Sequence, residues 1–272
     1  MSFKQFSFDN ALCAALESAG YRSASALNEA LIPQYLNACD LYVTAPLGAG
    51  KTTSALICAF HQTMQLKTDT NTEDNAPSVI ILVPTREQGN HVVRTAIEIS
   101  RFIPNAPRIS TCQNPYHLIE NPPPFYMDIL VTTPENFVDS IKEKNISAHR
   151  VQTVIYKCAD QMIDAGYWNE MERIHRLMPK DYQSVILASN SLEGDLAEIS
   201  RVFQKSPFKY TAQAHDDTNC FINERVQIAD HLDHKKQLLD FLVRDGEVTC
   251  AYIITCTSVS AKKLSLYLQS KL

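Results

Sequence analysis

APLGAGKT, at residues 45–52, has the form A-x-x-x-x-G-K-T of a phosphate-binding loop with alanine at its first position. Glycine allows backbone N–H groups to turn inward around a phosphate, and the helix that follows presents its positive N-terminal end. The Lys51 ammonium is expected on the outer phosphates of a nucleotide, and the Thr52 hydroxyl on Mg²⁺. The residues expected to bind the nucleotide here are Ala45, Pro46, Leu47, Gly48, Ala49, Gly50, Lys51 and Thr52.

The residues on either side of this loop support the same interpretation. LYVTAP (41–46) is a short apolar run rich in strand-forming residues, and an apolar helical segment follows the loop directly. The chain has only 7 glycines, about a third of average usage, yet Gly48 and Gly50 lie almost side by side. A chance GKT at a helix start is the alternative, but it explains neither the context nor the clustered glycines.

Beyond the loop, short apolar segments alternate with amphipathic helical segments. Strands are predicted at 41–46, 78–84, 107–111, 127–132, 151–157 and 183–189. Helices are predicted at 10–20, 25–36, 86–102, 134–143 and 167–177, besides the one after the loop, and 66–77 is predicted as an exposed loop. This order predicts an α/β fold in which helices cover both faces of a parallel sheet.

The alternation ends near residue 205, and we predict a linker over 205–225. A second unit follows, with a helix predicted at 234–243, a strand at 250–256 and a helix from 260 to the end. This unit is too small for an independent sheet domain. Either the chain is a fragment, or these residues pack on the first lobe.

Composition excludes several classes of protein. The 272 residues carry 25 Lys plus Arg against 30 Asp plus Glu, a formal net charge of −5, so the chain does not coat nucleic acid by overall charge, although a local basic groove stays open. The 8 cysteines lack zinc-ligand spacing, and the settings of Cys58 and Cys158 predict free thiols in a reducing compartment. Without a signal-peptide pattern or a membrane-spanning apolar run, we expect an intracellular protein, cytoplasmic or nuclear and most simply cytoplasmic, with no membrane partner.

Further short motifs stand before and after the loop in a definite order. They are Gly20-Tyr21, Asn28, Pro84-Thr85-Arg86-Glu87, Thr132-Thr133-Pro134, and Ala159-Asp160. Each alone is compatible with an ordinary turn or helix start. Their order and spacing together resemble the N-terminal lobe of a DEAD-box RNA helicase, where the motifs read GF, PTPIQ, APTGSGKT, PTREL, TPGR, DEAD and SAT. The resemblance covers about residues 3–204 and implies a RecA-like P-loop domain, with a truncated start of a second RecA-like lobe after it.

The resemblance also implies boundaries and roles. Residues 1–36 resemble the family's Q-motif region, 37–204 its ATP-binding lobe, 205–225 the linker and 226–272 the beginning of the C-terminal lobe. Tyr21 would stack on adenine, and Asn28, where the family has Gln, offers the same amide on a shorter side chain. Thr85, Arg86 and Thr133 would contact RNA phosphates. The alternative for Arg86 is a surface residue with an ion-pair partner.

The chain departs from the family at the residues that carry catalysis. Asp-Glu-Ala-Asp is replaced by Lys157, Cys158, Ala159 and Asp160, and Ser-Ala-Thr by Ala188, Ser189 and Asn190. The first Asp normally holds the Mg²⁺ shell and the Glu activates the attacking water, and neither an ammonium nor a thiol fills these roles. On the RNA side, Glu135 stands for a glycine and repels phosphate, and Gln113-Asn114 replaces a glycine pair.

Three functions stay open at this point. The first is a pseudo-helicase that binds nucleotide and RNA without ATP hydrolysis or unwinding. The second is an active ATP-dependent RNA helicase in a full-length form, and the third is a protein-interaction scaffold with a relic loop. ATP or ADP is the expected cofactor, and weakly bound RNA and unidentified proteins are the expected partners. Degenerate lobes of this kind also occur in Tudor-domain proteins of germline small-RNA pathways, and this chain could be such a piece.

Lys157 adds a prediction about the metal. An ammonium in place of a carboxylate repels a divalent ion. It attracts a phosphate by up to roughly 4 kcal/mol at about 4 Å and an effective dielectric of about 20, before desolvation. Binding of ATP or ADP is therefore expected to be largely independent of Mg²⁺. The alternative is that Lys157 extends into solvent or pairs with Asp160 or another acid.

Overall fold

The computed structural model describes residues 2–66, 76–112, 127–189, 195–212, 226–244 and 248–270. The chain divides into two compact units, Met1–His215 and Asp216–Leu272, and each is described by itself. Gln113, Asn114 and Asn190 lie outside the described residues, as does most of the loop predicted at 66–77.

The first unit is built on a seven-stranded sheet in which all neighbouring strands are parallel. The strand order is β3-β4-β2-β5-β6-β1-β7. The strands are β1 (Leu41–Thr44), β2 (Val79–Leu82), β3 (Ile109–Cys112), β4 (Ile129–Thr132), β5 (Thr153–Lys157), β6 (Gln183–Ala188) and β7 (Phe208–Thr211). The inner strands β2, β4, β5 and β6 are buried along their whole length, because helices shield a parallel sheet on both sides.

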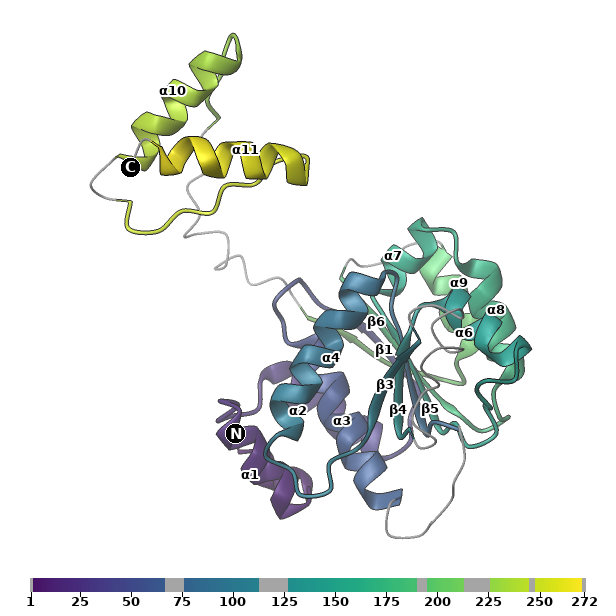
Figure 1. Cartoon of the computed structure of the whole chain (residues 1–272). Coiled ribbons are helices and arrows are strands. Elements are labelled where there is room, and N and C mark those ends of the chain that lie inside the picture. Colours follow the sequence, from purple (N-terminus) through teal and green to yellow (C-terminus); the bar gives the residue numbers. More distant parts are fainter. Residues whose placement is uncertain are drawn as a thin grey trace. The chain divides into compact units, whose positions relative to one another are not determined.

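Helices cover both faces of this sheet, as Figure 1 shows. One face packs against η1 (Phe3–Phe6), α1 (Asn10–Ser18), α2 (Ala26–Leu36), α3 (Lys51–Leu66) and α4 (Arg86–Ser100). The other packs against α6 (Pro134–Lys142), α7 (Ala159–Asp164), α8 (Trp168–Leu177) and α9 (Asp195–Phe203). Successive residues of a strand point to opposite faces, so Ile81 joins the first core and Ile80 the second. The predicted α/β fold is confirmed.

Parallel pairing brings the carboxyl ends of all seven strands to one edge of the sheet. Thr44 of β1 is in register with Ala188 of β6, and Lys157 of β5 with Leu187. On the other side, the carboxyl end of β5 lies beside that of β2, which in turn lies beside that of β4. The segments that leave β1, β2, β4, β5 and β6 carry the sequence motifs from residue 45 onward, so the fold gathers these motifs along one edge.

The predicted linker over 205–225 is wrong in its first part. Phe208–Thr211 form strand β7, which pairs in parallel with the outer edge of β1, with Leu41 opposite Phe208. Its residues alternate between half-buried and exposed, as in an edge strand, so the segment lacks the continuous apolar run of the inner strands. This segment forms a strand because the outer edge of β1 offers backbone hydrogen bonds to it. The sequence of the segment itself does not reveal that such an edge is available.

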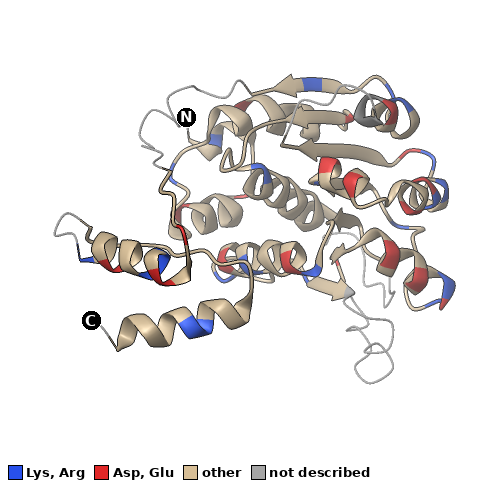
Figure 2. Ribbon diagram, turned by 90° about the horizontal axis from the view of Figure 1, so that it is seen from above, with Lys and Arg blue, Asp and Glu red and all other residues tan. Residues whose placement is uncertain are grey.

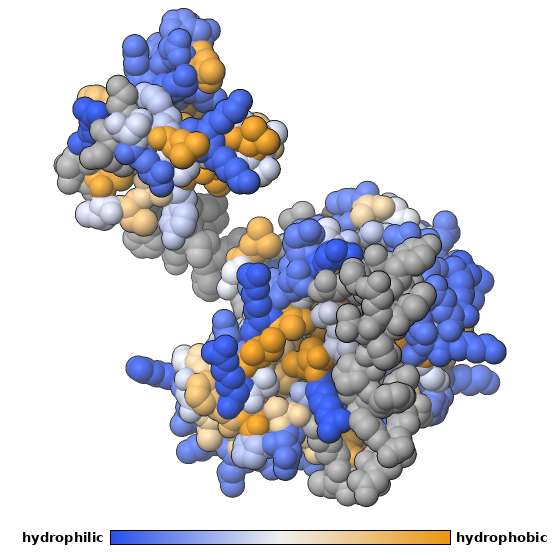
Figure 3. Space-filling model, viewed as in Figure 1, coloured by the Kyte–Doolittle hydropathy of each residue, from blue (hydrophilic) through white to orange (hydrophobic). Residues whose placement is uncertain are grey.

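The second unit contains α10 (Leu232–Val243) and α11 (Ser258–Gln269), close to the predicted helices. The strand predicted at 250–256 is wrong, since residues 248–257 have no strand structure. A strand needs a neighbour for its backbone hydrogen bonds, and the described residues of this unit supply none. Its apolar side chains therefore stay exposed, Tyr252 at 93% and Ile254 at 94%, and apolar residues are visible on the surface of the unit in Figure 3.

Within the described ranges, none of the helices has both the length and the apolar character that a membrane span requires.

Gln204, a buried glutamine, joins β1 and β6 at the opposite, amino-terminal edge of the sheet. Its Nε2 donates to the Leu41 carbonyl at 2.8 Å and to the Ser184 carbonyl at 3.0 Å, and its Oε1 accepts from Ser200 Oγ at 2.8 Å. Gln204→Leu is expected to lower the free energy of unfolding by about 1–3 kcal/mol, because buried polar groups lose their partner. Urea denaturation measures this. The control is Gln152→Leu at an exposed glutamine, and an equal loss in both variants would contradict the assignment.

Candidate functional site

The loop at 45–52 is bonded to the sheet where it begins and continues into a helix where it ends. Ala45 N donates to the carbonyl of Ala188 at 3.1 Å, so β6 supports the start of the loop. Gly48 and Gly50 have φ of +83° and +85°, a backbone conformation that residues with a Cβ rarely adopt. α3 then begins at Lys51. The predicted strand, glycine turn and helix are therefore present in that order.

Lys51 is buried against its own loop, with 8% of the residue exposed. Its ammonium donates to the carbonyl of Pro46 at 2.9 Å and also to that of Ala45. Burial lowers the pKa of Lys51, the nearby Cys158 and Asp160 oppose this, and the positive charge of Lys157 lowers the pKa further. The residues predicted from two separate motifs therefore act electrostatically on one another in the folded chain.

Lys157, the last residue of β5, is equally buried, with 8% exposed. Its Nζ donates to Gln88 Oε1 at 3.2 Å and contacts Cys158 Sγ at 3.5 Å. The Gln88 amide in turn donates to Gln161. Lys157 thus does not extend into solvent, and within the described ranges no carboxylate lies at ion-pair distance from it. Sequence reasoning missed Gln88, since nothing local marks a residue of α4 as the partner of β5.

Asp160 and Ser189 connect the two degenerate catalytic motifs. The Asp160 carboxylate is buried, and its Oδ2 accepts from Ser189 N at 3.1 Å. Asp160 Oδ1 and Ser189 Oγ are also buried, and neither has a hydrogen-bond partner among the described residues. Cys158, between Lys157 and α7, has a left-handed φ of 58°. The site therefore keeps one carboxylate of the four-residue motif, and this carboxylate is already engaged by the backbone.

The structure gives little support for a metal ion here. The position expected to carry a metal-binding carboxylate holds an ammonium, which repels cations. Thr52, the predicted hydroxyl ligand, is half-buried at the start of α3. In the part of the chain that the structure describes, no three His, Cys, Asp or Glu side chains come together as metal ligands. The residues present do not fit a tightly held Mg²⁺.

Asn28 contacts the helix that follows the phosphate-binding loop. Its Oδ1 accepts from Ser54 Oγ at 2.6 Å, and Ser54 also back-bonds to the Gly50 carbonyl at 3.0 Å. Ser25 caps α2 and so fixes the backbone of Asn28, while Tyr21 is half-buried in the turn after α1. The region 1–36 is thus tied directly to the loop through Ser54, a residue that the motif analysis did not single out.

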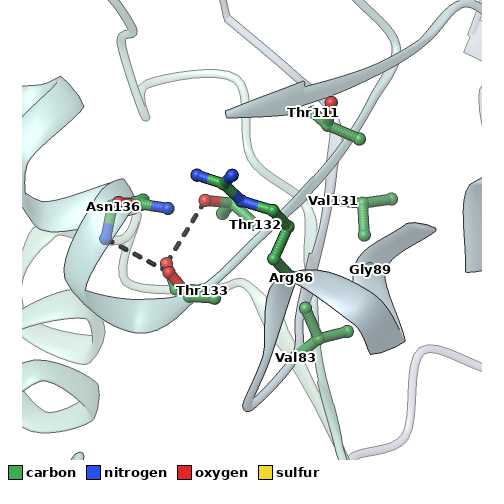
Figure 4. Close-up of a pocket in the computed structure, with 8 residues that line it drawn as sticks. All are labelled: Val83, Arg86, Gly89, Thr111, Val131, Thr132, Thr133 and Asn136. Atoms are coloured by element: carbon green, nitrogen blue, oxygen red, sulfur yellow. Dashed lines mark hydrogen bonds between the residues drawn. The ribbon is translucent and has the colours of Figure 1, made fainter. Parts of the chain in front are cut away.

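A small pocket lies at the carboxyl ends of β2, β3 and β4, on the same edge of the sheet as the phosphate-binding loop (Figure 4). Its lining residues are Val83, Arg86, Gly89, Thr111, Val131, Thr132, Thr133 and Asn136. Thr85 caps α4, and Thr133 caps α6 by accepting from Asn136 N at 3.4 Å. The Arg86 guanidinium extends across the pocket beside Thr132 in Figure 4. Two helix N-termini and one guanidinium therefore face a single pocket, which suits an anionic group.

Comparison with known proteins agrees with this arrangement. The family model described as DEAD/DEAH box helicase matches residues 25–199. The chain belongs to the DEAD/DEAH box helicase family. Within this family, it is 27% identical to the ATP-dependent RNA helicase SrmB of Haemophilus influenzae over 99% of the chain and 61% of that protein. It is 28% identical to Escherichia coli SrmB over 91% of the chain and 55% of that protein.

A solved helicase-like structure shows the same fold. S. cerevisiae Dbp5, solved bound to Gle1 and IP6, matches with a TM-score of 0.75 at 19% identity, over 99% of this chain and 66% of that one. The similarity supports the RecA-like α/β assignment of this DEAD/DEAH box helicase chain. The chain spans less than two thirds of the length of the curated helicases to which it was compared above.

The Asn28–Ser54 contact makes a measurable contribution to stability in this helicase chain. Ser54→Ala and Asn28→Ala are each expected to lower the free energy of unfolding, with a coupling energy of about 0.5–1.5 kcal/mol in a double-mutant cycle. Ser54→Ala leaves the buried Asn28 Oδ1 without its donor, whereas after Asn28→Ala the Ser54 hydroxyl keeps only its bond to the Gly50 carbonyl. Chemical denaturation of the four proteins measures it. Ser18→Ala is the control, since exposed Ser18 Oγ back-bonds to Ala14 and has no side-chain partner in the structure. A coupling energy of zero would contradict the proposed tie.

Proposed function

We propose that this chain is a DEAD-box pseudo-helicase, a module that binds adenine nucleotide and RNA without hydrolysing ATP. One observation carries the proposal: a buried Lys157 beside the phosphate-binding loop, followed by Cys158, at the two positions where the family has its metal-binding Asp and its water-activating Glu. Family membership supports nucleotide binding, whereas these two residues replace the groups that the family uses to hydrolyse ATP.

Nucleotide binding is supported by the intact loop. Gly48 and Gly50 keep the positive φ that a phosphate-wrapping backbone needs, and Lys51 stands at the first turn of α3 with its ammonium turned into the loop. Asn28 and Tyr21 lie on the N-terminal segment, which is bonded to α3 through the contact of Asn28 with Ser54. We expect this segment to contact the adenine ring.

The expected loss of ATP hydrolysis rests on the side chains that replace the catalytic acids, since the phosphate-binding loop itself is present. The Cys158 thiol is buried in contact with the Lys157 ammonium, and a thiol in that position offers no carboxylate to orient and deprotonate water. Asp160, the remaining acid, is engaged by Ser189 N. The nucleotide would be held and released unchanged.

RNA binding is supported more weakly, by the pocket around Arg86 and Thr133. Its guanidinium and helix N-termini favour phosphate, but Glu135 is exposed in the first turn of α6 at the same end of the sheet. Among the described residues of the first unit, Figure 2 shows Lys and Arg interspersed with Asp and Glu rather than gathered in a broad basic band. This distribution favours a few local phosphate contacts over binding by overall charge.

Two other functions are separated from this one by experiment. An active helicase in a longer form of the protein requires turnover that depends on Lys51. A scaffold with a relic loop requires that neither ATP nor ADP binds. Nucleotide titration and phosphate release therefore distinguish the three.

Phosphate release by the purified chain is expected to stay at background, with and without single-stranded RNA. Loss of a general base alone reduces rates by about 10²–10⁴, and the lost metal ligand reduces them further. The measurement is a coupled phosphate assay on wild type, with Lys51→Ala as the control for contaminating ATPase. RNA-stimulated turnover of helicase size that disappears in Lys51→Ala would overturn the pseudo-helicase proposal.

RNA binding is expected to be weak and to fall steeply as salt is raised. Arg86→Ala should weaken it at every RNA sequence and flatten the slope of log affinity against log salt by about one unit, because one phosphate contact is lost. Fluorescence anisotropy with a labelled oligonucleotide over a salt series measures this. Arg176→Ala, at an exposed arginine paired with Glu172 on α8, is the matched control. Tight binding that survives high salt, or equal effects of both variants, would refute the assignment of Arg86.

A further inference from the structure

We propose that Lys51 and Lys157 together hold the phosphates of the bound nucleotide, so that binding needs no Mg²⁺. The inference rests on the proposed nucleotide binding and specifies how it occurs in this chain. Lys157 takes the place of the divalent ion as the second positive charge on the polyphosphate.

The positions of the two lysines carry the inference. β1, β6 and β5 are consecutive neighbours in the sheet, so the loop after β1 and Lys157 at the end of β5 emerge at the same edge. Both residues are buried to the same extent, with 8% exposed. The positive charge of Lys157 contributes to lowering the pKa of Lys51, which places the two ammonium groups within electrostatic reach. Two buried cations that face one site are favourable when an anion lies between them.

The contacts of Lys157 keep its charge available. Gln88 Oε1 and Cys158 Sγ, the two groups that it contacts, are an amide oxygen and a thiol rather than carboxylates, so they orient the ammonium without neutralising it. An ammonium has three N–H donors, and these contacts use two of them. The third can reach a phosphate oxygen. The alternative considered from sequence, a lysine extended into solvent or neutralised by Asp160, does not match this geometry.

The charges around the site favour an anion over a cation. Lys51 and Lys157 contribute two positive charges and Asp160 contributes one negative charge, while Cys158 acts on the pKa of Lys51 in the same direction as Asp160. Asp160 Oδ2 is already used by Ser189 N. A divalent ion placed here would meet an ammonium where the family has a carboxylate. A polyphosphate would meet two ammonium groups and the N-terminus of α3.

Gln88 is the positioning residue of this arrangement. It lies in the first turn of α4, two residues after Arg86, and its side chain is held between Gln161 and Lys157. Removing its amide would leave Lys157 without the acceptor that fixes the position of its ammonium. Gln88→Leu should therefore weaken nucleotide binding in the absence of Mg²⁺ while leaving the loop itself unchanged.

The test is calorimetric titration of the whole chain with ATP and with ADP, first in Mg²⁺ and then in excess EDTA. Wild type is expected to bind with the same Kd in both, within about threefold. Lys157→Asp should bind at least about tenfold more tightly in Mg²⁺ than in EDTA, since one charge reversal in a buried site exceeds one decade of affinity. Lys157→Met, which keeps length and apolar bulk, should bind at least about tenfold more weakly than wild type in EDTA.

Matched controls separate the site from overall charge. Lys180→Asp changes net charge by the same amount at an exposed lysine just before β6, at the other edge of the sheet, and should leave both titrations unchanged. Gln88→Leu should fall between wild type and Lys157→Met in EDTA. Thermal unfolding of each variant, followed by circular dichroism, shows whether the fold is kept, and Lys157→Met decides the matter if Lys157→Asp does not fold.

Each outcome bears on one of the two proposals. Wild-type binding that is present in Mg²⁺ and lost in EDTA overturns the two-lysine site and leaves nucleotide binding intact, with Thr52 and water then holding the metal. Binding that is equal in both media but unchanged in Lys157→Met also overturns it. No binding of ATP or ADP in either medium removes the proposed function itself.

Discussion

Parallel pairing of β1 with β6 is the interaction on which the rest of the structure depends. It joins the loop after β1 to the end of β6 through the bond from Ala45 N to the Ala188 carbonyl. It also places β5 next in line, so that Lys157 and Asp160 leave the sheet beside the loop. A shift of one residue in this register would turn every buried side chain of the strand to the opposite face. The packing of the core therefore also fixes the positions of the residues at the site.

Buried charged side chains lie close together at the same edge of the sheet, and burying them opposes folding. Two lysines and one aspartate are each less than a tenth exposed there, and isolated buried charges are strongly destabilising. The fold offsets this with directed contacts: carbonyls of the loop around Lys51, Gln88 on Lys157 and Ser189 N on Asp160. An anion bound between the lysines would relieve the remaining repulsion. If the two-lysine proposal holds, ligand binding should therefore also stabilise the fold at this edge.

The chain keeps the architecture of its family while changing the charge of the site. The bond between Asp160 and Ser189 N links the segments that follow two neighbouring strands, and Asn28 meets the loop helix through Ser54. Several motif residues differ from the family, and among them the change at the end of β5 reverses the sign of a buried side chain. Such a reversal changes which ions are attracted to this position, because the Coulomb energy of a pair of charges grows as the local dielectric constant falls.

Local sequence was sufficient for the elements whose pattern is written in consecutive residues. The strand, glycine turn and helix around Lys51 are local because backbone freedom and apolar periodicity are properties of neighbouring residues. β7 and the strand wrongly expected at 250–256 are not local, because a strand exists only where another strand offers an edge. The contact of Lys157 with Gln88 is likewise tertiary, since it joins residues 69 positions apart. The sequence by itself determined the fold class and the loop, whereas only the tertiary structure decided which side chains face one another, because long-range pairing sets those distances.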